Sequence, residues 1–350
     1  MNLKELSELL GLSQTTVSRA LNGYPEVSEI TRRRVTEAAA RHNYSPNARA
    51  KGLATGRAMA VGHVIPTSTR HEMVNPIFGD FLSGAGETYA AHGYGIVLST
   101  ADDGDQERVY REMKAKGAVD GVILHGPAVD DPRIALLRDL GLPFVVHGRA
   151  SAETGPYPWV DVNNSRAFEA ATDHLVGLGH RRIALLNGLE HMDFALRRRE
   201  GFARALAHHG LDEEPRFMAS EEMTEGYGYA RASEMLGLEP APTAFLVSSV
   251  IVAIGVRRAA EERGLKLGRD ISLITHDDEL SYLRNGDDVP LFTATRSSVR
   301  EAGRRAAAML IGLIEGGRRR GDPPNMLLEA PLVIGPSTGP ARQPTLHAAQ

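Results

Sequence analysis

From Ala58 onward, short apolar runs alternate with amphipathic helical segments, and this rhythm limits the possible folds more than any other feature. The apolar runs are AVGHVIP, YGIVLS, VDGVILHG, LPFVVHG, RIALLNG, AFLVSS and DISLITHDD. Helical periodicity occurs near residues 107–116, 132–140, 166–178, 197–209, 227–236, 251–263 and 299–316. Strands that alternate with helices build parallel sheets, so the pattern predicts an α/β fold. Because about 280 residues is long for one doubly wound sheet, we expect two doubly wound parallel-sheet subdomains that face a cleft.

The segment before Ala58 has a different pattern, which predicts three short helices. Asn2 and Glu5 have the spacing of a capping box, and the leucines that follow share one face of a helix from about 3 to 10. A glycine then ends this helix, while Ser13 and Ser28 are suited to cap two further helices. A helix, a glycine-containing turn and a second helix follow the plan of a helix-turn-helix, whose second helix enters the DNA major groove.

Charge is distributed unevenly along the 350 residues. The net charge of −4 does not by itself indicate a nucleic-acid binder. Residues 1–56, however, hold eight lysines and arginines against five acidic residues, a net charge of +3 that leaves −7 for the remainder. A small basic head therefore precedes a larger acidic body.

Several features exclude other classes of protein. The chain has no cysteine, which rules out disulfides and thiolate sites and fits a reducing compartment. MNLKELSELL lacks the pattern of a signal peptide, and the apolar stretch at 243–256 is too short for a membrane helix, which needs about 18 to 20 residues. No Walker motif or nucleophile elbow occurs. We therefore expect a cytoplasmic protein that is not an enzyme and has neither a metal nor a cofactor.

The head and the rhythm behind it resemble the lactose-repressor/galactose-repressor (LacI/GalR) family of bacterial transcription regulators. The resemblance is carried by LSQTTVSRALNG, by VSEITRRRVTEAAARHNYSPNARAKGLATG and by the α/β alternation, and it extends from residue 2 to about 338. It implies a homodimer that binds palindromic double-stranded operator DNA at the bacterial nucleoid. The implied parts are a helix-turn-helix headpiece (1–46), a hinge helix or linker (47–57), a periplasmic-binding-protein-like effector core (58–338) and a tail (339–350). Within the core, subdomain one is expected at about 58–160 and 296–327, and subdomain two at about 161–293 and 328–338.

Two groups of headpiece residues are candidates for DNA contacts. Gln14, Thr15 and Arg19 point away from the apolar face of the second helix, toward base edges, where arginine can donate to both guanine acceptors. Short polar side chains near helix ends suit phosphate oxygens, namely Ser13, Thr16, Ser18, Asn22, Ser28 and Thr31. Simple helix capping is an alternative role for Ser13 and Ser28.

The segment after the headpiece matches the family's hinge helix, which lies in the minor groove and inserts a leucine between base pairs. The resemblance assigns the wedge to Leu53 and backbone contacts to Arg49 and Lys51. The full set of expected contacts in the segment is Asn47, Arg49, Ala50, Lys51 and Leu53. An ordinary flexible linker is the alternative, because Gly52 weakens helix propensity.

The resemblance also implies a ligand site at the carboxyl ends of the strands. Arg198 and Asp277 fall where the family holds its ligand with a guanidinium and a carboxylate, groups that suit vicinal hydroxyls. Phe78 is expected to stack on a sugar face. The other expected contacts are His147, Arg149, Ser249 and Ser297. The set departs from the family: Ser249-Val250 replaces a common Asn-Asp, and His147 replaces an acid of the lactose repressor.

Some neighbours of this set are expected to have other roles. Asp278 is expected to be solvated or salt-bridged, and His276 to lie in the core or at the rim.

Together these observations predict a ligand-responsive, sequence-specific DNA-binding regulator. We expect it to repress genes of carbohydrate uptake or catabolism and to be relieved by a mono- or disaccharide. A corepressor-dependent regulator of the same fold is one alternative, and a carbohydrate-binding protein without a DNA role is another. The tail TGPARQPTLHAAQ has no leucine heptad, so we expect a dimer without a tetramer-forming helix.

Overall fold

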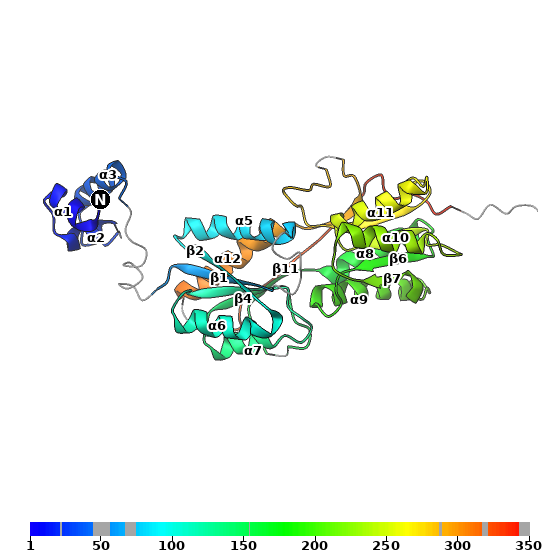
Figure 1. Ribbon diagram of the computed structural model, residues 1–350, viewed down its shortest axis with the longest axis horizontal. Coiled ribbons are helices and arrows are strands. Elements are labelled where there is room, and N and C mark those ends of the chain that lie inside the picture. The colour runs from blue at the N-terminus through cyan, green and yellow to red at the C-terminus, as the bar shows by residue number, and fades with distance from the viewer. Residues whose placement is uncertain are drawn as a thin grey trace, which may run out of the picture. The chain divides into compact units, whose positions relative to one another are not determined.

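Three helices form the N-terminal unit of the protein, whose computed structural model is drawn in Figure 1. They are α1 (Leu3–Leu10), α2 (Gln14–Leu21) and α3 (Glu29–Arg41). In the expected capping box, Asn2 accepts from the backbone N–H of Glu5, whose side chain accepts from the N–H of Asn2. The apolar faces of the helices enclose one small core, made of Leu6, Leu10, Val17, Ala20, Val27, Val35 and Ala39.

A larger unit begins at Ala60. The structure describes residues 1–21, 23–44, 57–66, 75–153, 155–286, 289–316 and 321–342. In these ranges no helix combines the length and the apolar character that a membrane crossing requires.

The first sheet of the larger unit has the strand order β11-β5-β4-β3-β1-β2, with every pair parallel. Its strands are β1 (Ala60–Pro66), β2 (Gly95–Ala101), β3 (Gly121–His125), β4 (Phe144–His147), β5 (Trp159–Val162) and β11 (Asn325–Leu328). One face is covered by α5 (Pro76–Ala91) and α12 (Val299–Gly316), and the other by α6 (Gln106–Ala115) and α7 (Pro132–Asp139) (Figure 1). A short 3-10 turn, η2 (Asp103–Asp105), precedes α6.

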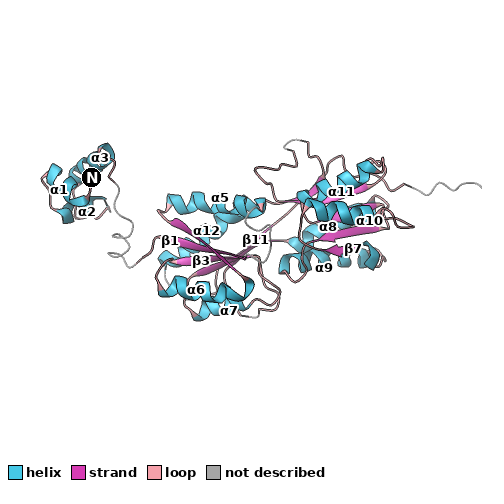
Figure 2. Ribbon diagram, in the orientation of Figure 1, coloured by secondary structure: helices cyan, strands magenta, loops and turns pink. Residues whose placement is uncertain are grey.

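The second sheet has the order β12-β10-β9-β8-β6-β7, parallel except for the antiparallel pair β10–β12. Its strands are β6 (Ile183–Asn187), β7 (Met218–Ser220), β8 (Ala244–Val247), β9 (Ser272–Asp277), β10 (Thr293–Arg296) and β12 (Leu332–Val333). The helix pairs α8 (Asn164–Gly177) with α9 (Asp193–His208), and α10 (Glu225–Met235) with α11 (Val250–Glu262), bury separate apolar clusters against it (Figure 2). A 3-10 turn, η3 (Pro215–Phe217), leads into β7.

The chain passes between the two sheets three times, from β5 into α8, from β10 into α12 and from β11 into β12. Direct contacts also join the two halves. The backbone N–H of Ser281 donates to Asp80 on α5 at 2.7 Å, and that of Ser151 donates to Asp193 on α9 at 2.6 Å. These contacts hold loops at the strand ends of one half against helices of the other.

The paired helices pack closely because glycines face the backbone of the opposing helix. A Cβ at Gly84 of α5 would lie 1.9 Å from the carbonyl oxygen of Arg300, and one at Gly303 of α12 would lie 2.2 Å from that of Phe81. Any larger side chain there would push the helices apart.

The fold class expected from the sequence is confirmed, a helix-turn-helix head followed by two parallel-dominated sheets. The expected helices behind the head all occur, with ends that differ by up to four residues. Helix α5 was not anticipated, since its three glycines obscure the helical pattern, and neither were the short strands β5, β7, β10, β11 and β12. The expected hinge helix lies outside the described residues.

Candidate functional site

Helix α2 presents a polar face that is suited to reading bases. Its Val17 and Ala20 are buried in the core of the N-terminal unit, while Gln14, Thr15 and Arg19 are exposed. Within the described residues the Arg19 guanidinium makes no ion pair, whereas the nearby Arg32, Arg33 and Lys4 pair with glutamates. An exposed, unpaired arginine on such a face can donate to both acceptors of a guanine.

Two of the expected phosphate contacts also cap helices. Ser13 accepts from the backbone N–H of Thr16 at 3.0 Å, and Ser28 accepts from that of Thr31 at 3.3 Å. The threonine hydroxyls lie within 2.8 and 2.9 Å of the same serine oxygens. Capping therefore occurs, and it orients these four hydroxyls at the starts of α2 and α3. Ser18 is half-buried on α2.

The remaining expected DNA contacts fall outside the described residues. They are Asn22, Asn47, Arg49, Ala50, Lys51 and Leu53. Their roles stay predictions.

Arg198 lies at the centre of the candidate ligand site in the larger unit. Its Nε donates to Asn164 and its Nη1 to the carbonyl oxygen of Ser248, both at 2.8 Å. The rings of Phe168 and Phe194 flank the guanidinium, at 5.2 and 5.0 Å from their centroids. Burial lowers the pKa of Arg198 to about 10, so it remains charged. No described residue bonds to Nη2, which leaves one arm of the fork for a ligand oxygen.

Two adjacent carboxylates follow β9 and have different surroundings. Asp277 accepts from the backbone N–H of Glu279 at 2.9 Å and forms an ion pair with Arg296 at 3.1 Å, so both of its oxygens bind within the protein. Asp278 lies 3.5 Å from the imidazole of His276. Burial raises the pKa of Asp278, but the attraction of His276, Arg198 and His147 outweighs that effect and lowers it.

Arg198 and Asp278 therefore attract each other, whereas Asp277 is held by Arg296 and by the backbone of Glu279. The ligand contact expected for Asp277 stays a prediction.

Opposite these groups, the ends of β3 and β4 bring two histidines together. His125 and His147 are register partners, with ring centroids 5.8 Å apart. Phe81 lies 4.3 Å from the His147 ring, and Phe78 lies edge-on to His125 at 5.0 Å. Burial lowers the pKa of His147 to about 4, against the opposing effect of Asp278, so the imidazole is neutral near pH 7.

His125 was not predicted from the sequence. Its signal is its place in VDGVILHG, where it ends an apolar run just as His147 ends LPFVVHG. Parallel strands put such terminal residues on one edge.

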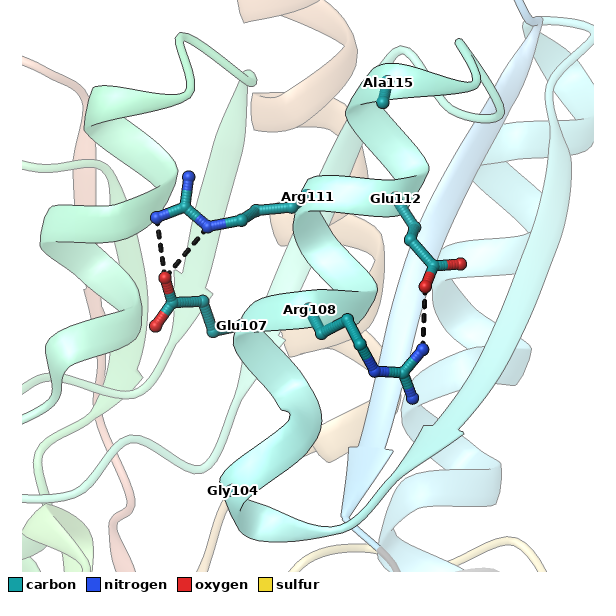
Figure 3. Close-up of a pocket in the computed structure, with 6 residues that line it drawn as sticks. All are labelled: Gly104, Glu107, Arg108, Arg111, Glu112 and Ala115. Carbon is teal, nitrogen blue, oxygen red and sulfur yellow. Dashed lines mark hydrogen bonds and ion pairs between the residues drawn. The ribbon is translucent and has the colours of Figure 1, made fainter.

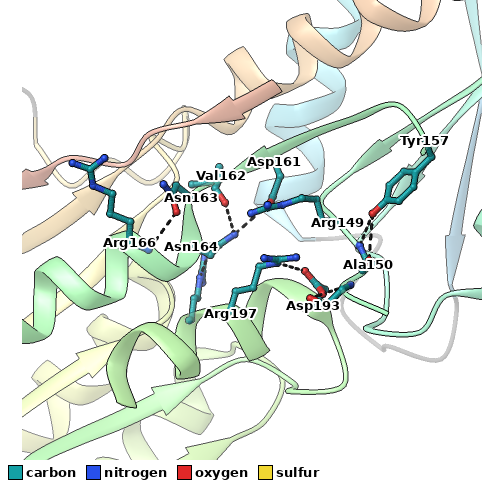
Figure 4. A network of polar contacts seen from close by, with 12 residues as sticks. Arg149, Ala150, Tyr157, Asp161, Val162, Asn163, Asn164, Arg166, Asp193 and Arg197 are labelled. Carbon is teal, nitrogen blue, oxygen red and sulfur yellow. Dashed lines mark hydrogen bonds and ion pairs between the residues drawn. The ribbon is translucent and has the colours of Figure 1, made fainter. Parts of the chain in front are cut away.

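Arg149 belongs to a polar network that leads to the site (Figure 4). Its Nε donates to Asp161 at 2.7 Å, and its guanidinium lies over the ring of Trp159. Asp161 accepts from Asn164 at 3.5 Å, and Asn164 in turn accepts from Arg198. Burial raises the pKa of Asp161, partly offset by Arg149. Arg149 thus supports the position of Arg198 through two intermediates.

The two expected serines are buried close to the site. Ser249 caps α11 by accepting from the backbone N–H of Val252 at 3.3 Å. Ser297 lies 3.3 Å from Nε2 of His276, whose Nδ1 lies 2.9 Å from the hydroxyl of Thr295. Ser249 therefore has a capping role, and Ser297 contacts the histidine that lies beside Asp278.

One hollow on the described surface is lined by residues that already pair with each other. A hollow of about 430 Å³ along α6 is lined by exposed, helical ion pairs, Arg108 with Glu112 and Arg111 with Glu107 (Figure 3). Such exposed pairs contribute at most about 1 kcal/mol each. Across the described ranges, no group of three or more histidine or acidic side chains is arranged to hold a metal ion.

Two family models match the chain. The model described as bacterial regulatory proteins, lacI family, matches residues 2–47. The model of a periplasmic binding protein-like domain matches residues 172–338.

Two similar proteins cover 97% and 65% of the chain. The HTH-type transcriptional regulator AglR of Rhizobium meliloti is 47% identical over 343 residues, which are 97% of this chain and 95% of that protein. The HTH-type transcriptional regulator RafR of Escherichia coli is 34% identical over 227 residues, 65% of this chain and 67% of that protein.

Solved structures with similar folds include the lac repressor dimer bound to operator and the anti-inducer ONPF, at 26% identity and a TM-score of 0.77 over 97% of this chain and 99% of that one. The transcriptional regulator CelR–cellobiose complex has 26% identity and a TM-score of 0.70 over 96% and 99%.

Proposed function

Since this chain belongs to the LacI family of bacterial regulatory proteins, we propose that it represses genes of carbohydrate uptake or catabolism and releases its operator when a sugar binds. It is a DNA-binding transcriptional regulator with a helix-turn-helix head and a periplasmic-binding-protein-like core. The proposal for operator binding rests on the face of α2, and the proposal for sugar binding rests on the candidate ligand site around Arg198.

For DNA, the supporting observation is the face of α2. Gln14, Thr15 and Arg19 are exposed on a helix whose Val17 and Ala20 are buried. A dimer would place two such helices on the two halves of a palindromic operator. The capped starts of α2 and α3 would bind phosphates and fix the register of each head.

For the sugar, the observation that carries the proposal is that Arg198, with one arm of its guanidinium unbonded, and Asp278 are close enough to attract each other electrostatically. A guanidinium arm donates to hydroxyl oxygens, and a carboxylate accepts from hydroxyl hydrogens, so together they recognise vicinal hydroxyls. Phe78 and His147 supply ring surface from the first half, and the buried Phe81 packs behind the His147 ring. We propose a mono- or disaccharide ligand, in keeping with the similarity to a regulator solved with cellobiose.

Coupling between the sites follows from where the ligand groups lie. Arg198 and Asp278 belong to the half built on the second sheet, and His125 and His147 belong to the first. A ligand that contacts residues of both halves favours one arrangement of the halves. If operator DNA binds best to a different arrangement, the ligand lowers operator affinity. A thousandfold change in operator affinity requires about 4 kcal/mol of differential binding.

A thermal-shift screen tests the ligand class. Glucose, galactose, maltose, cellobiose, raffinose and the purines guanine and hypoxanthine would be added separately to the full chain. A ligand at 100 times its Kd adds about 2.7 kcal/mol of stability, which raises Tm by several degrees. We expect a sugar to do this for the wild type and not for Arg198→Lys, which keeps the charge but loses the planar fork. A response to purines alone would contradict the proposal.

A further inference from the structure

A buried chain of three side chains runs from the core of the first half to the candidate site. The hydroxyl of Tyr89 on α5 lies 3.2 Å from Nε2 of His63 on β1. Nδ1 of His63 lies 2.8 Å from Nε2 of His125 at the end of β3. Tyr89 and His63 are 1% and 0% exposed, while His125 is partly exposed. Neither Tyr89 nor His63 has a role in the function proposed above.

The direction of the hydrogen bonds in this row of side chains is set by Tyr89, which stands at its buried end. Within the described residues, His63 is the only hydrogen-bond partner of the Tyr89 hydroxyl. A phenol has one hydrogen to donate, and leaving it unpaired in a buried place costs free energy. The hydroxyl therefore donates to Nε2 of His63, and this nitrogen must carry no proton.

Both histidines are neutral, so the tautomer of His63 determines the tautomer of His125. Burial lowers the pKa of His63 to about 3. Burial and the nearby His63 and His147 hold the pKa of His125 well below its usual value. A neutral His63 with a bare Nε2 carries its proton on Nδ1, which donates to Nε2 of His125. His125 must then carry its own proton on Nδ1.

The free nitrogen of His125 belongs to the candidate ligand site. Its Nδ1 makes no hydrogen bond with the described residues. This atom is absent from the fully buried, unbonded atoms of those residues, so solvent or a ligand can reach it. The ring lies beside Phe78 and His147. If the chain ran in the opposite direction, the same nitrogen would be an acceptor.

We propose that Tyr89 and His63 are positioning residues that hold His125 as its Nδ1–H tautomer, so that the site offers a hydrogen-bond donor at this point. The Nδ1–H donor recognises a ligand oxygen that can accept a hydrogen bond, such as a ring or glycosidic oxygen. A ligand group that can only donate would not be recognised at this point. Only this last step rests on the proposed function, since the tautomer itself is a property of the chain without ligand.

Nitrogen NMR of the full chain tests the proposal directly. The protein would be labelled with ¹⁵N-histidine, and long-range proton–nitrogen correlations recorded at pH 7.5 distinguish protonated from bare ring nitrogens. His63→Gln and His125→Gln variants assign the two rings. We expect Nδ1–H and bare Nε2 in both rings of the wild type. A wild-type spectrum in which the assigned His125 ring is protonated on Nε2 would overturn the proposal.

Two tyrosine variants then test the source of the direction. Tyr89→Phe removes the terminal donor, and we expect the His125 Nδ1 and Nε2 resonances to move toward each other as both tautomers become populated. Tyr110→Phe is the matched control, because it removes another buried hydroxyl that has no partner in the described residues. Unchanged histidine resonances in a folded Tyr89→Phe would overturn the role of Tyr89. All spectra are recorded without ligand, so a failure of the sugar proposal would leave their outcome unaffected.

Discussion

Replacing Asp278 by asparagine tests which of two adjacent carboxylates serves the ligand. The Asp278→Asn substitution keeps the shape of the side chain but removes the negative charge that faces Arg198 and His147. A ligand hydroxyl left without its charged acceptor in a buried site costs about 1 to 3 kcal/mol. We therefore expect sugar affinity to fall about 5- to 150-fold, with operator affinity in the absence of sugar unchanged.

Asp277→Asn is the matched neighbour, and we expect it to affect folding first. The carboxylate of Asp277 is 2% exposed and pairs with Arg296, and breaking a buried ion pair costs about 3 to 5 kcal/mol when the partner is left alone. The amide oxygen of the asparagine can still accept the hydrogen bond from the backbone N–H of Glu279, so part of the stabilisation by residue 277 is retained.

Isothermal titration with the sugar from the screen and thermal unfolding would be measured on both variants. Loss of sugar binding in Asp277→Asn at an unchanged Tm, together with normal binding in Asp278→Asn, would refute the assignment.

Three further outcomes are expected. Arg19→Ala should relax base preference at one position of each half-site at a cost of about 1 to 3 kcal/mol, measured on a panel of operator variants, and an equal loss on every variant would contradict base reading. Gly84→Ala should lower Tm sharply or prevent folding, because its Cβ would lie 1.9 Å from a backbone oxygen of α12, while Gly86→Ala on the same helix, with its nearest atom at 3.8 Å, should leave Tm equal or higher. Burial lowers the pKa of His63 from 6.5 to about 3 in the folded protein. Between these pH values the unfolded protein binds a proton on His63 that the folded protein does not bind. The free energy of unfolding should therefore fall by about 1.4 kcal/mol per pH unit below pH 6.5 because of this histidine. Unfolding curves of the wild type and His63→Gln between pH 7.5 and 5 would check this, and equal slopes would count against it.

The elements with strong local signals could be predicted from the sequence. The capping box at Asn2 and the serine caps of α2 and α3 depend on nearest neighbours in the chain, and the structure has them as expected. The seven expected helices of the larger unit were recognised from their apolar faces, although their ends differ by up to four residues from the expected ones. The sequence does not predict helix α5, because Gly84 weakens its helical pattern and is required only by the close approach of α12. That contact joins segments more than 200 residues apart. Local propensity carries no information about such a contact.

The candidate site was only partly predictable for similar reasons. Arg198 could be placed from its match to the family, and His147 from its position at the end of an apolar run. The choice between Asp277 and Asp278 depends on the turn after β9, where Glu279 has a positive φ of 51° and its N–H bonds back to Asp277. Composition does not specify that turn. The link from Tyr89 through His63 to His125 joins three elements and appears only when they are assembled.

The most direct test of the account is a titration of operator binding with sugar. Fluorescence anisotropy of a labelled palindromic operator would be measured with the full chain, with increasing amounts of the sugar that raises Tm, and in parallel with Arg198→Lys. The account predicts that wild-type operator affinity falls by at least tenfold as the sugar saturates, a coupling of at least about 1.4 kcal/mol, and that the variant binds the operator normally without responding. Operator affinity that stays constant or rises with saturating sugar would contradict it.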